Sequence, residues 1–245
     1  MRIAILEDDP DQAAFLVRTL EAQITRGDTV VSCTVFSDGT QAQRVLRRES
    51  FDLLVLDWNV PGVDGAELLH WLRVWQQDAV PVLMLSSRTS EHDVARVLNA
   101  GADDYVIKPF RAVELGARVQ RMLARRLPRA TSATERFGQW EFISLSLEVV
   151  IHPEAPGDSP PEIHELSERE FKLTLTLFQN MGRVLSRAHL LESAGYAGSE
   201  IGSRTLDSHI YRLRKKLGLE PGRGLNLRTV YGRGYCLEVQ EDRSA

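Results

Sequence analysis

Leu53-Leu54-Val55-Leu56-Asp57 is an unbroken apolar run that ends at a carboxylate. An apolar run without alternation predicts a strand buried on both faces of a parallel sheet. Similar short bursts lie at 2–6, 29–35, 81–85 and 105–107, and amphipathic stretches predict helices at about 10–25, 38–48, 64–75, 90–100 and 111–125. This alternation predicts an α/β fold with a doubly wound, five-stranded parallel sheet, in which ligands bind beyond the carboxyl ends of the strands.

The composition is that of a globular protein. The chain has 245 residues, of which 43% are hydrophobic and 26% charged, and its net charge is −4. This length suggests two domains at roughly 100–200 residues each, and the composition excludes a mainly disordered chain. No apolar run approaches the roughly 18 residues of a membrane span, and the first residues lack the apolar stretch of a signal peptide. Two distant cysteines give neither a disulfide framework nor zinc spacing, so we expect a cytoplasmic protein without membrane contact.

Charge is distributed unevenly along the chain. Residues 1–124 carry 13 Lys and Arg against 18 Asp and Glu, whereas residues 203–233 carry eight against two. A basic segment in an acidic protein is typical of a nucleic-acid contact, but also of a solvated helix face. The charge pattern by itself leaves both interpretations open.

Carboxylates follow two of the predicted strands. Asp8 and Asp9 come after the strand at 2–6, and Asp57 follows the third strand, Leu53-Leu54-Val55-Leu56. In a sheet whose first and third strands are adjacent, these side chains converge at one edge, where they must take up protons or bind a cation. Such oxygen ligands suit Mg²⁺ completed by phosphate oxygens, and a carboxylate can itself attack phosphorus.

Two further polar residues lie at the ends of the fourth and fifth predicted strands. Ser86 ends the fourth strand and Lys108 follows the fifth, so that a hydroxyl and an ammonium group could bind phosphoryl oxygens. Taken singly, each of these residues is explained by ordinary cap or turn chemistry. The set is more specific, because each member lies at the carboxyl end of a different predicted strand.

Four stretches make residues 1–124 similar to the receiver domain of a two-component response regulator. They are Ile5-Leu6-Glu7-Asp8-Asp9, Val55-Leu56-Asp57-Trp58-Asn59-Val60-Pro61-Gly62, Met84-Leu85-Ser86-Ser87-Arg88 and Gly101-Ala102-Asp103-Asp104-Tyr105-Val106-Ile107-Lys108-Pro109-Phe110.

The resemblance implies a role for each residue of the pocket. Asp57 would accept a phosphoryl group from a sensor histidine kinase, and Mg²⁺ would be held by Asp8, Asp9, Asp57 and the main-chain carbonyl of Asn59. The phosphoryl group would be bound by Ser86 and Lys108 and reported by a rotamer change of Tyr105. Asn59 and Arg88 occupy positions that tune the lifetime of the phosphoryl group in such domains.

The second half has a different pattern. Residues 125–135 are polar and without period and predict a linker, a second domain is expected over 136–240, and 241–245 is a tail. Strand-like bursts at 137–151 precede a proline-rich loop at 152–161. Ser167 and Glu170 form a capping-box signal for a helix that continues to about residue 180, and further helices are predicted at 187–194 and 204–217. A hairpin is expected over 227–239.

The helix predicted at 204–217 has two distinct faces. Four leucine and isoleucine residues form an apolar stripe, and another face carries Arg204, Ser208, Tyr211, Arg212 and Lys215. Such a face suits the major groove of DNA, where arginine binds guanine and other cations bind phosphates. An amphipathic surface helix is the alternative that this pattern alone leaves open.

Three stretches in this half add a second resemblance. Leu166-Ser167-Glu168-Arg169-Glu170-Phe171, Gly182-Arg183-Val184-Leu185-Ser186-Arg187 and Leu227-Arg228-Thr229-Val230-Tyr231-Gly232-Arg233-Gly234-Tyr235 make residues 136–240 similar to the winged-helix domain of OmpR/PhoB response regulators. The resemblance implies an α+β winged helix-turn-helix with a recognition helix at 204–217, a wing at 228–235 and a loop around 195–202 that faces RNA polymerase. The expected DNA contacts are Arg204, Ser208, His209, Tyr211, Arg212, Arg214, Lys215, Arg228 and Arg233. Tyr231 stands where the family often has an arginine.

The resemblance also implies assembly. In this family phosphorylation favours a symmetric receiver dimer, and Asp104, Glu114 and Arg118 match charged positions of its interface. Val94 stands where a basic residue often pairs with the acidic residue at 114, so one ion pair is expected to be missing.

We therefore expect a transcription regulator that is phosphorylated on Asp57, dimerises and binds promoter DNA. Its chemistry would be self-catalysed phosphoryl transfer and slow hydrolysis, not the turnover of a metabolite. One alternative is a winged-helix regulator that works without phosphorylation. Another is a Mg²⁺-dependent phosphohydrolase, which is disfavoured because Asp57-Trp58-Asn59 places no second side-chain carboxylate beside the nucleophile.

Overall fold

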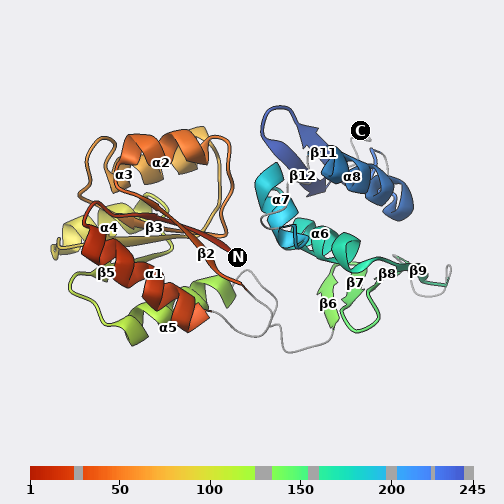
Figure 1. Cartoon of the computed structure of the whole chain (residues 1–245), viewed down its shortest axis with the longest axis horizontal. Coiled ribbons are helices and arrows are strands. Elements are labelled where there is room, and N and C mark those ends of the chain that lie inside the picture. The colour runs from red at the N-terminus through yellow and green to blue at the C-terminus, as the bar shows by residue number, and fades with distance from the viewer. Residues whose placement is uncertain (25–29, 125–133, 154–159, 197–202, 222–223, 240–245) are drawn as a thin grey trace. The chain divides into compact units, whose positions relative to one another are not determined.

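The computed structural model describes residues 1–24, 30–124, 134–153, 160–196, 203–221 and 224–239. The chain divides into two compact units, Met1–Arg126 and Leu127–Ala245 (Figure 1). Most of the predicted linker and the whole predicted tail lie outside the described residues, and the first strand of the second unit begins at Thr134. The domain limits therefore stay a prediction. Within the described residues, no helix is long and apolar enough to cross a membrane.

The first unit is built on one parallel sheet. Its strands are β1 (Arg2–Leu6), β2 (Ser32–Phe36), β3 (Leu53–Asp57), β4 (Val82–Ser86) and β5 (Asp104–Ile107), in the order β2-β1-β3-β4-β5. The helices are α1 (Pro10–Ile24), α2 (Gly39–Leu46), α3 (Gly65–His70), α4 (Glu91–Asn99) and α5 (Ala112–Ala124). The predicted doubly wound fold is confirmed.

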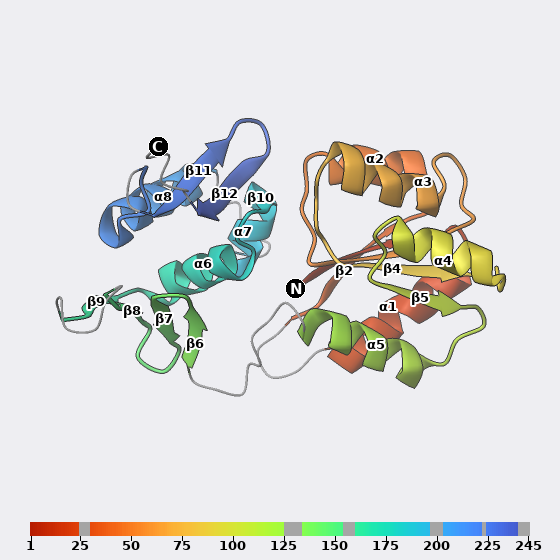
Figure 2. The ribbon, with the colours of Figure 1, turned by 180° about the vertical axis from the view of Figure 1, so that it is seen from behind.

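Helices cover both faces of this sheet. Figure 2 shows α1 and α5 on one face and α2, α3 and α4 on the other. Two separate apolar cores reflect this division. Leu16 and Leu115 belong to the α1–α5 core, whereas Leu68 and Val97 belong to the core beneath α2–α4. Because β3 is buried on both faces, its run lacks alternation, as the sequence suggested.

The helix predicted at 64–75 ends differently from the prediction. After α3 the backbone widens into a π-helical turn, η1 (Trp71–Trp75). Arg73 fixes this turn, since its guanidinium donates to the carbonyls of Gly101, Asp78 and Val80 at 3.0, 2.6 and 2.8 Å. The apolar periodicity of the segment gave no sign of the change.

In the described residues of the second unit, two antiparallel sheets combine with three helices. One sheet contains β6 (Thr134–Phe137), β7 (Trp140–Ile143), β8 (Glu148–Ile151) and β9 (Glu162–Glu165) in chain order. The other has the order β10-β12-β11, with β10 (Val184–Ser186), β11 (Leu225–Val230) and β12 (Gly234–Val239). The helices are α6 (Glu168–Gln179), α7 (Arg187–Ser193) and α8 (Ser203–Leu217). The predicted α+β winged-helix fold is confirmed, although β9 and β10 were not predicted.

Local sequence signals explain the ends of two elements in this unit. Ser167 and Glu170 form the predicted capping box at the start of α6, each side chain bonding the other's backbone N–H. The hairpin of β11 and β12 closes with Val230 opposite Gly234. Gly232 has a φ of 70°, a conformation that favours glycine and turns the chain tightly. The tip of this hairpin therefore projects Tyr231, which is 99% exposed.

Candidate functional site

The carboxyl edge of the parallel sheet gathers the predicted pocket residues. Asp57 is the last residue of β3 and Ser86 the last of β4, and both are buried. Lys108 directly follows β5, and its backbone N–H donates to the carbonyl of Ser86 at 2.9 Å. The structure therefore brings a carboxylate, a hydroxyl and an ammonium group from three adjacent strands to one edge.

The ammonium group of Lys108 lies between two buried carboxylates. Its Nζ is 2.8 Å from Oδ2 of Asp57 and 2.7 Å from Oε2 of Glu7. Burial is the largest effect on Glu7 and raises the pKa of its carboxyl group. Burial alone would lower the pKa of Lys108, but the hydrogen bonds to Asp57 and Glu7 outweigh it and raise the pKa. The lysine is therefore held as a cation against Asp57.

Three carboxylates are close enough to share one cation. Glu7, Asp8 and Asp57 each offer an oxygen, and these oxygens lie within 4.8 Å of one another. Asp8 is exposed, whereas the other two are buried. Carboxylate oxygens with an open, solvent-facing side are the donors that Mg²⁺ accepts while keeping some of its waters. The donor set therefore fits a hard divalent cation.

Asp9 was predicted as a member of this group, but its carboxylate is not among the three that lie together. Its Oδ1 accepts the backbone N–H groups of Asp11 and Gln12 at 2.9 and 3.0 Å, the bonds of a helix N-cap. These backbone bonds, chiefly that from Gln12, lower the pKa of Asp9. Glu7 takes its place beside Asp8 and Asp57. The signal was available, because Pro10 suits the first position of a helix and makes the preceding residue the cap.

Arg88 joins two other predicted residues of the pocket. Its backbone N–H donates to Oγ of Ser86 at 3.1 Å, and its carbonyl accepts the hydroxyl of Tyr105 at 2.8 Å. In addition, the backbone N–H of Asn59 donates to Oδ1 of Asp57 at 3.2 Å. Arg88 and Asn59, which the resemblance assigns to the lifetime of the phosphoryl group, are thus hydrogen-bonded to Ser86 and Asp57, which it assigns to the phosphoryl group itself.

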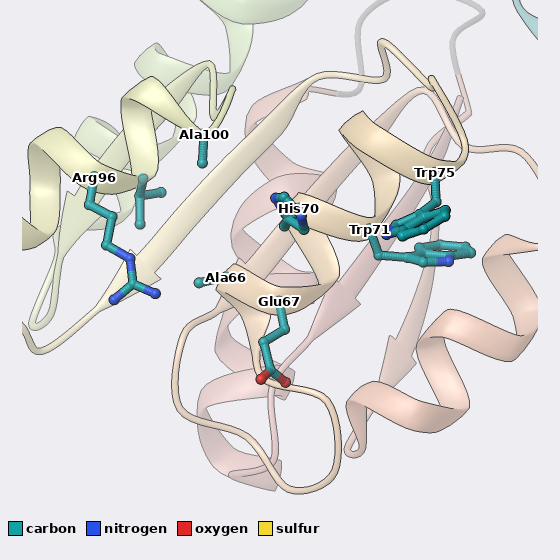
Figure 3. Close-up of a pocket in the computed structure, with 8 residues that line it drawn as sticks. Ala66, Glu67, His70, Trp71, Trp75, Arg96 and Ala100 are labelled. Atoms are coloured by element: carbon teal, nitrogen blue, oxygen red, sulfur yellow. The ribbon is translucent and has the colours of Figure 1, made fainter.

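The described part of the first unit contains two cavities of note. One, of about 420 Å³, includes Lys108 and is lined also by Gln12, Phe15, Ser87, Pro109 and Phe110. The other, of about 380 Å³, lies between the α3–η1 segment and α4. Figure 3 shows the residues that line this cavity: His70, Trp71 and Trp75 come from the α3–η1 segment, and Arg96 and Ala100 come from α4 and its C-terminal end. The first cavity adjoins the charged pocket, and the second adjoins the inner face of α4.

In the second unit, α8 presents the expected two faces. Leu206, Ile210 and Leu213 are buried in the core, and Ser208, Tyr211 and Arg212 are exposed. The side chain of Arg204 lies outside the described residues, as does most of the loop at 195–202. A helix with this exposed face is compatible with a nucleic-acid contact.

Several of the predicted DNA contacts have partners within the unit. The guanidinium of Arg214 donates to the carbonyl of Leu227 at 2.7 Å and to Oγ1 of Thr229 at 2.9 Å, which ties α8 to β11. Nε2 of His209 lies 3.0 Å from the hydroxyl of Tyr196. The remaining pairs join Lys215 to Glu220 and Arg228 to Glu238, at 2.9 and 3.1 Å. Helical spacing could not distinguish the partly buried His209 and Arg214 from the exposed residues of α8.

The three charged residues of the expected dimer interface form a cluster within one chain. Arg118 bonds Asp104 at 3.1 Å and Glu114 at 2.9 Å. Arg121 approaches Asp104 at 3.6 Å. Val94 packs half-buried against the core beneath α4, as an apolar residue at that position can.

Comparison with known proteins defines the class. Residues 3–120 match the family model "Response regulator receiver domain", and residues 162–237 match "Transcriptional regulatory protein, C terminal". A receiver joined to this winged-helix domain makes the chain a response regulator transcription factor rather than an enzyme of metabolism.

Individual relatives define the family. The phosphate regulon regulatory protein PhoB of Rhizobium meliloti is 37% identical over 97% of this chain and 98% of its own length. TctD of Salmonella typhimurium is 35% identical over 97% of each chain. Among solved structures, response regulator DrrB of Thermotoga maritima, an OmpR/PhoB homolog, covers 97% of this chain and 98% of its own with 26% identity and a TM-score of 0.42. The chain belongs to the OmpR/PhoB family of two-component response regulators.

Proposed function

We propose that Asp57 is the phosphoacceptor of this regulator. A carboxylate oxygen of Asp57 attacks the phosphorus of a phosphohistidine on a sensor histidine kinase. The new P–O bond forms as the P–N bond breaks, and the histidine nitrogen leaves with the electron pair. Slow hydrolysis later transfers the phosphoryl group to water and restores the carboxylate.

The position of Lys108 carries this proposal. Its ammonium group contacts both Asp57 and Glu7 in a buried pocket, and the buried Ser86 ends the adjacent strand β4. A cation and a hydrogen-bond donor fixed there before the reaction can bind the charge that develops on phosphoryl oxygens, at little cost in reorganisation. The carboxylate of Asp57 combines contact with Lys108 and a place at the end of the central strand β3, whereas Glu7 follows β1.

The acidic group would hold Mg²⁺. Its ligands would be Glu7, Asp8 and Asp57, together with the main-chain carbonyl of Asn59 that the family resemblance suggests. The bound ion would neutralise charge on the carboxylates and on the transferred group. Asp9 is left out of this proposal because its carboxylate caps α1.

The experiment uses the full chain with acetyl phosphate and Mg²⁺. Intact mass analysis is expected to show one phosphoryl adduct on the native chain and none on Asp57→Asn. The control is Asp11→Asn, which removes an exposed acidic group from the first turn of α1 and should leave the adduct intact. An adduct that persists on Asp57→Asn would disprove the assignment.

We further propose that phosphorylation promotes a receiver homodimer that binds double-stranded promoter DNA in the cytoplasm and contacts RNA polymerase. The exposed Tyr211 and Arg212 of α8 support the DNA contact, and the cluster of Asp104, Glu114 and Arg118 supports the dimer surface. Light scattering on the phosphorylated and unmodified chain tests the dimer. A native chain that carries the adduct, remains monomeric and binds DNA no better than before would leave the phosphorylation-independent regulator as the better explanation.

A further inference from the structure

Trp58 lies between the phosphoacceptor and α4. It follows Asp57 directly, and its backbone N–H donates to the carbonyl of Leu85 at 2.9 Å, next to Ser86. Trp58 is 2% exposed and belongs to the core that also contains Val97 of α4. A large aromatic ring thus connects the end of β3 with the helix that faces it.

Two guanidinium groups lie over this indole. The Cζ of Arg88 is 4.7 Å from the ring centroid, and that of Arg96 on α4 is 5.9 Å away. Two like charges would repel each other, but the electron-rich ring attracts both. Asp93 of α4 adds a pair with Arg88 at 3.8 Å. The side chain of Arg88 is therefore held toward α4 by the ring and by an acidic residue of that helix.

The backbone of Arg88 faces the pocket instead. Its N–H donates to Ser86 and its carbonyl accepts from Tyr105. One residue therefore contacts a proposed phosphoryl-binding hydroxyl through its main chain and α4 through its side chain. A flexible arginine side chain that starts at this point can lie on the indole or swing toward the carboxyl end of β3.

We propose that Trp58 is a positioning residue that keeps the guanidinium of Arg88 on α4 and away from Asp57 until Asp57 is phosphorylated. A phosphoryl group adds up to two negative charges beside Trp58 and attracts the same cation. When the guanidinium moves to the phosphoryl oxygens, α4 loses its link to Arg88, and Arg96, which also lines the cavity of Figure 3, has the indole to itself. The inference rests on Asp57 being the phosphoacceptor.

The lifetime of the phosphoryl group tests this competition. Without the indole, Arg88 keeps only the 3.8 Å pair with Asp93 of the two described contacts that hold it toward α4, and its guanidinium covers the phosphoryl oxygens more readily. Trp58→Leu should therefore lengthen the lifetime about threefold to tenfold, the range expected for a partly buried cation–π contact. Trp58→Phe keeps an aromatic face and should stay close to the native lifetime. In an Arg88→Gln background, Trp58→Leu should change nothing, because no cation remains to be released.

Two outcomes of this experiment would overturn the proposal. One is a phosphoryl lifetime that is unchanged or shorter in Trp58→Leu. The other is a lifetime that Trp58→Leu lengthens equally in the native and the Arg88→Gln background, because such a change would reflect packing alone. Intact mass on the native chain separates this failure from that of the proposed function. If the native chain forms no adduct on Asp57, the assignment of the phosphoacceptor itself is wrong. If it forms one, but Trp58→Leu does not lengthen the lifetime in the native background alone and leave it unchanged in the Arg88→Gln background, only the role of Trp58 is wrong.

A spectroscopic measurement removes the dependence on Trp58→Leu folding correctly. The chain is labelled with 5-fluorotryptophan, and the Trp58 resonance is assigned by its absence in Trp58→Phe. Arg88→Gln, at a residue whose side chain is 44% exposed, should shift this resonance in the unphosphorylated chain while Trp140 of the second unit stays unchanged. Phosphorylation should then shift it less in Arg88→Gln than in the native chain. A Trp58 resonance that is insensitive to Arg88→Gln would overturn the proposal.

Discussion

The pocket of the receiver unit and the exposed face of α8 differ in how they use charge. In the pocket, Lys108 is held within hydrogen-bond distance of two buried carboxylates. On α8, Arg212 is exposed, whereas Arg214 is bound to the adjacent strand. Chemistry at one atom requires groups that converge before the reaction, while a surface that binds a long anion only needs some cations to stay available. Removing a basic residue is therefore expected to have different consequences in the pocket and on α8.

The largest effect is expected in the pocket, from Lys108→Met. This change leaves the carboxylates of Glu7 and Asp57 buried without their cation, so the free energy of unfolding of the receiver unit should fall by about 3 kcal/mol at pH 7 without divalent cations. Urea unfolding followed by tryptophan fluorescence measures it. Lys172→Met, which removes an exposed pair with Glu168, is the control and should cost less than about 0.5 kcal/mol.

The pH dependence of this loss follows from Glu7. Burial raises the pKa of its carboxyl group above the ordinary value of 4.5, so the folded state binds this proton more tightly than the unfolded state does. Its contribution therefore favours folding below pH 4.5 and decreases as the pH rises through the raised pKa. Removing Lys108 raises that pKa further, and the loss in Lys108→Met should be smaller at pH 5 than at pH 7. An equal loss at both pH values would show that lost packing, not charge, is responsible.

The second effect separates a structural arginine from an exposed one. Arg214→Ala removes the hydrogen bonds to Leu227 and Thr229 and should lower the stability of the winged-helix unit by about 2 kcal/mol. Arg212→Ala should leave the stability within about 0.5 kcal/mol and instead reduce the salt dependence of DNA binding by about one phosphate contact. Thermal unfolding and DNA titrations at several salt concentrations measure the two. If both variants lose only DNA affinity, the bonds of Arg214 to β11 are not important in solution.

The third effect tests the acidic pocket. Glu7→Gln removes one carboxylate of the group and should weaken Mg²⁺ binding about tenfold, as loss of a charged oxygen ligand does. Asp9→Asn should leave it unchanged, since asparagine caps a helix about as well as aspartate. Calorimetric titration with Mg²⁺ compares the two variants. A larger loss in Asp9→Asn would restore the assignment made from the sequence.

The contrast between the two regions also explains what the sequence could predict. The pocket was largely predictable because parallel strands place their carboxyl ends at one edge, which fixes Asp57, Ser86 and Lys108 without any knowledge of side-chain contacts. Asp9 was misplaced because three acidic residues follow β1 and only the helix start at Pro10 distinguishes their roles. On α8 the period identified the buried stripe, but the bonds of Arg214 depend on β11, thirteen residues further along the chain.

The π-helical turn and Trp58 show a similar limit. The period of η1 is close enough to that of an α-helix for its apolar residues to look regular, and the turn depends on bonds from Arg73 to distant carbonyls. Trp58 gave no signal at all, because an aromatic residue after a strand is most simply a core residue. Only the positions of Arg88 and Arg96 over its ring give it a further role.

The smallest effect is expected at the proposed dimer surface. Glu114 and Arg118 form an exposed i,i+4 pair, so Glu114→Gln should lower the stability of the receiver unit by about 0.3–0.5 kcal/mol at low salt and by less at high salt. Asp104 is more buried and pairs with both Arg118 and Arg121, so Asp104→Asn should cost more than Glu114→Gln in the same unfolding experiment. If Glu114→Gln instead abolishes the dimer of the phosphorylated chain in light scattering while stability hardly changes, Glu114 acts between chains, and the pair with Arg118 is the arrangement of the monomer.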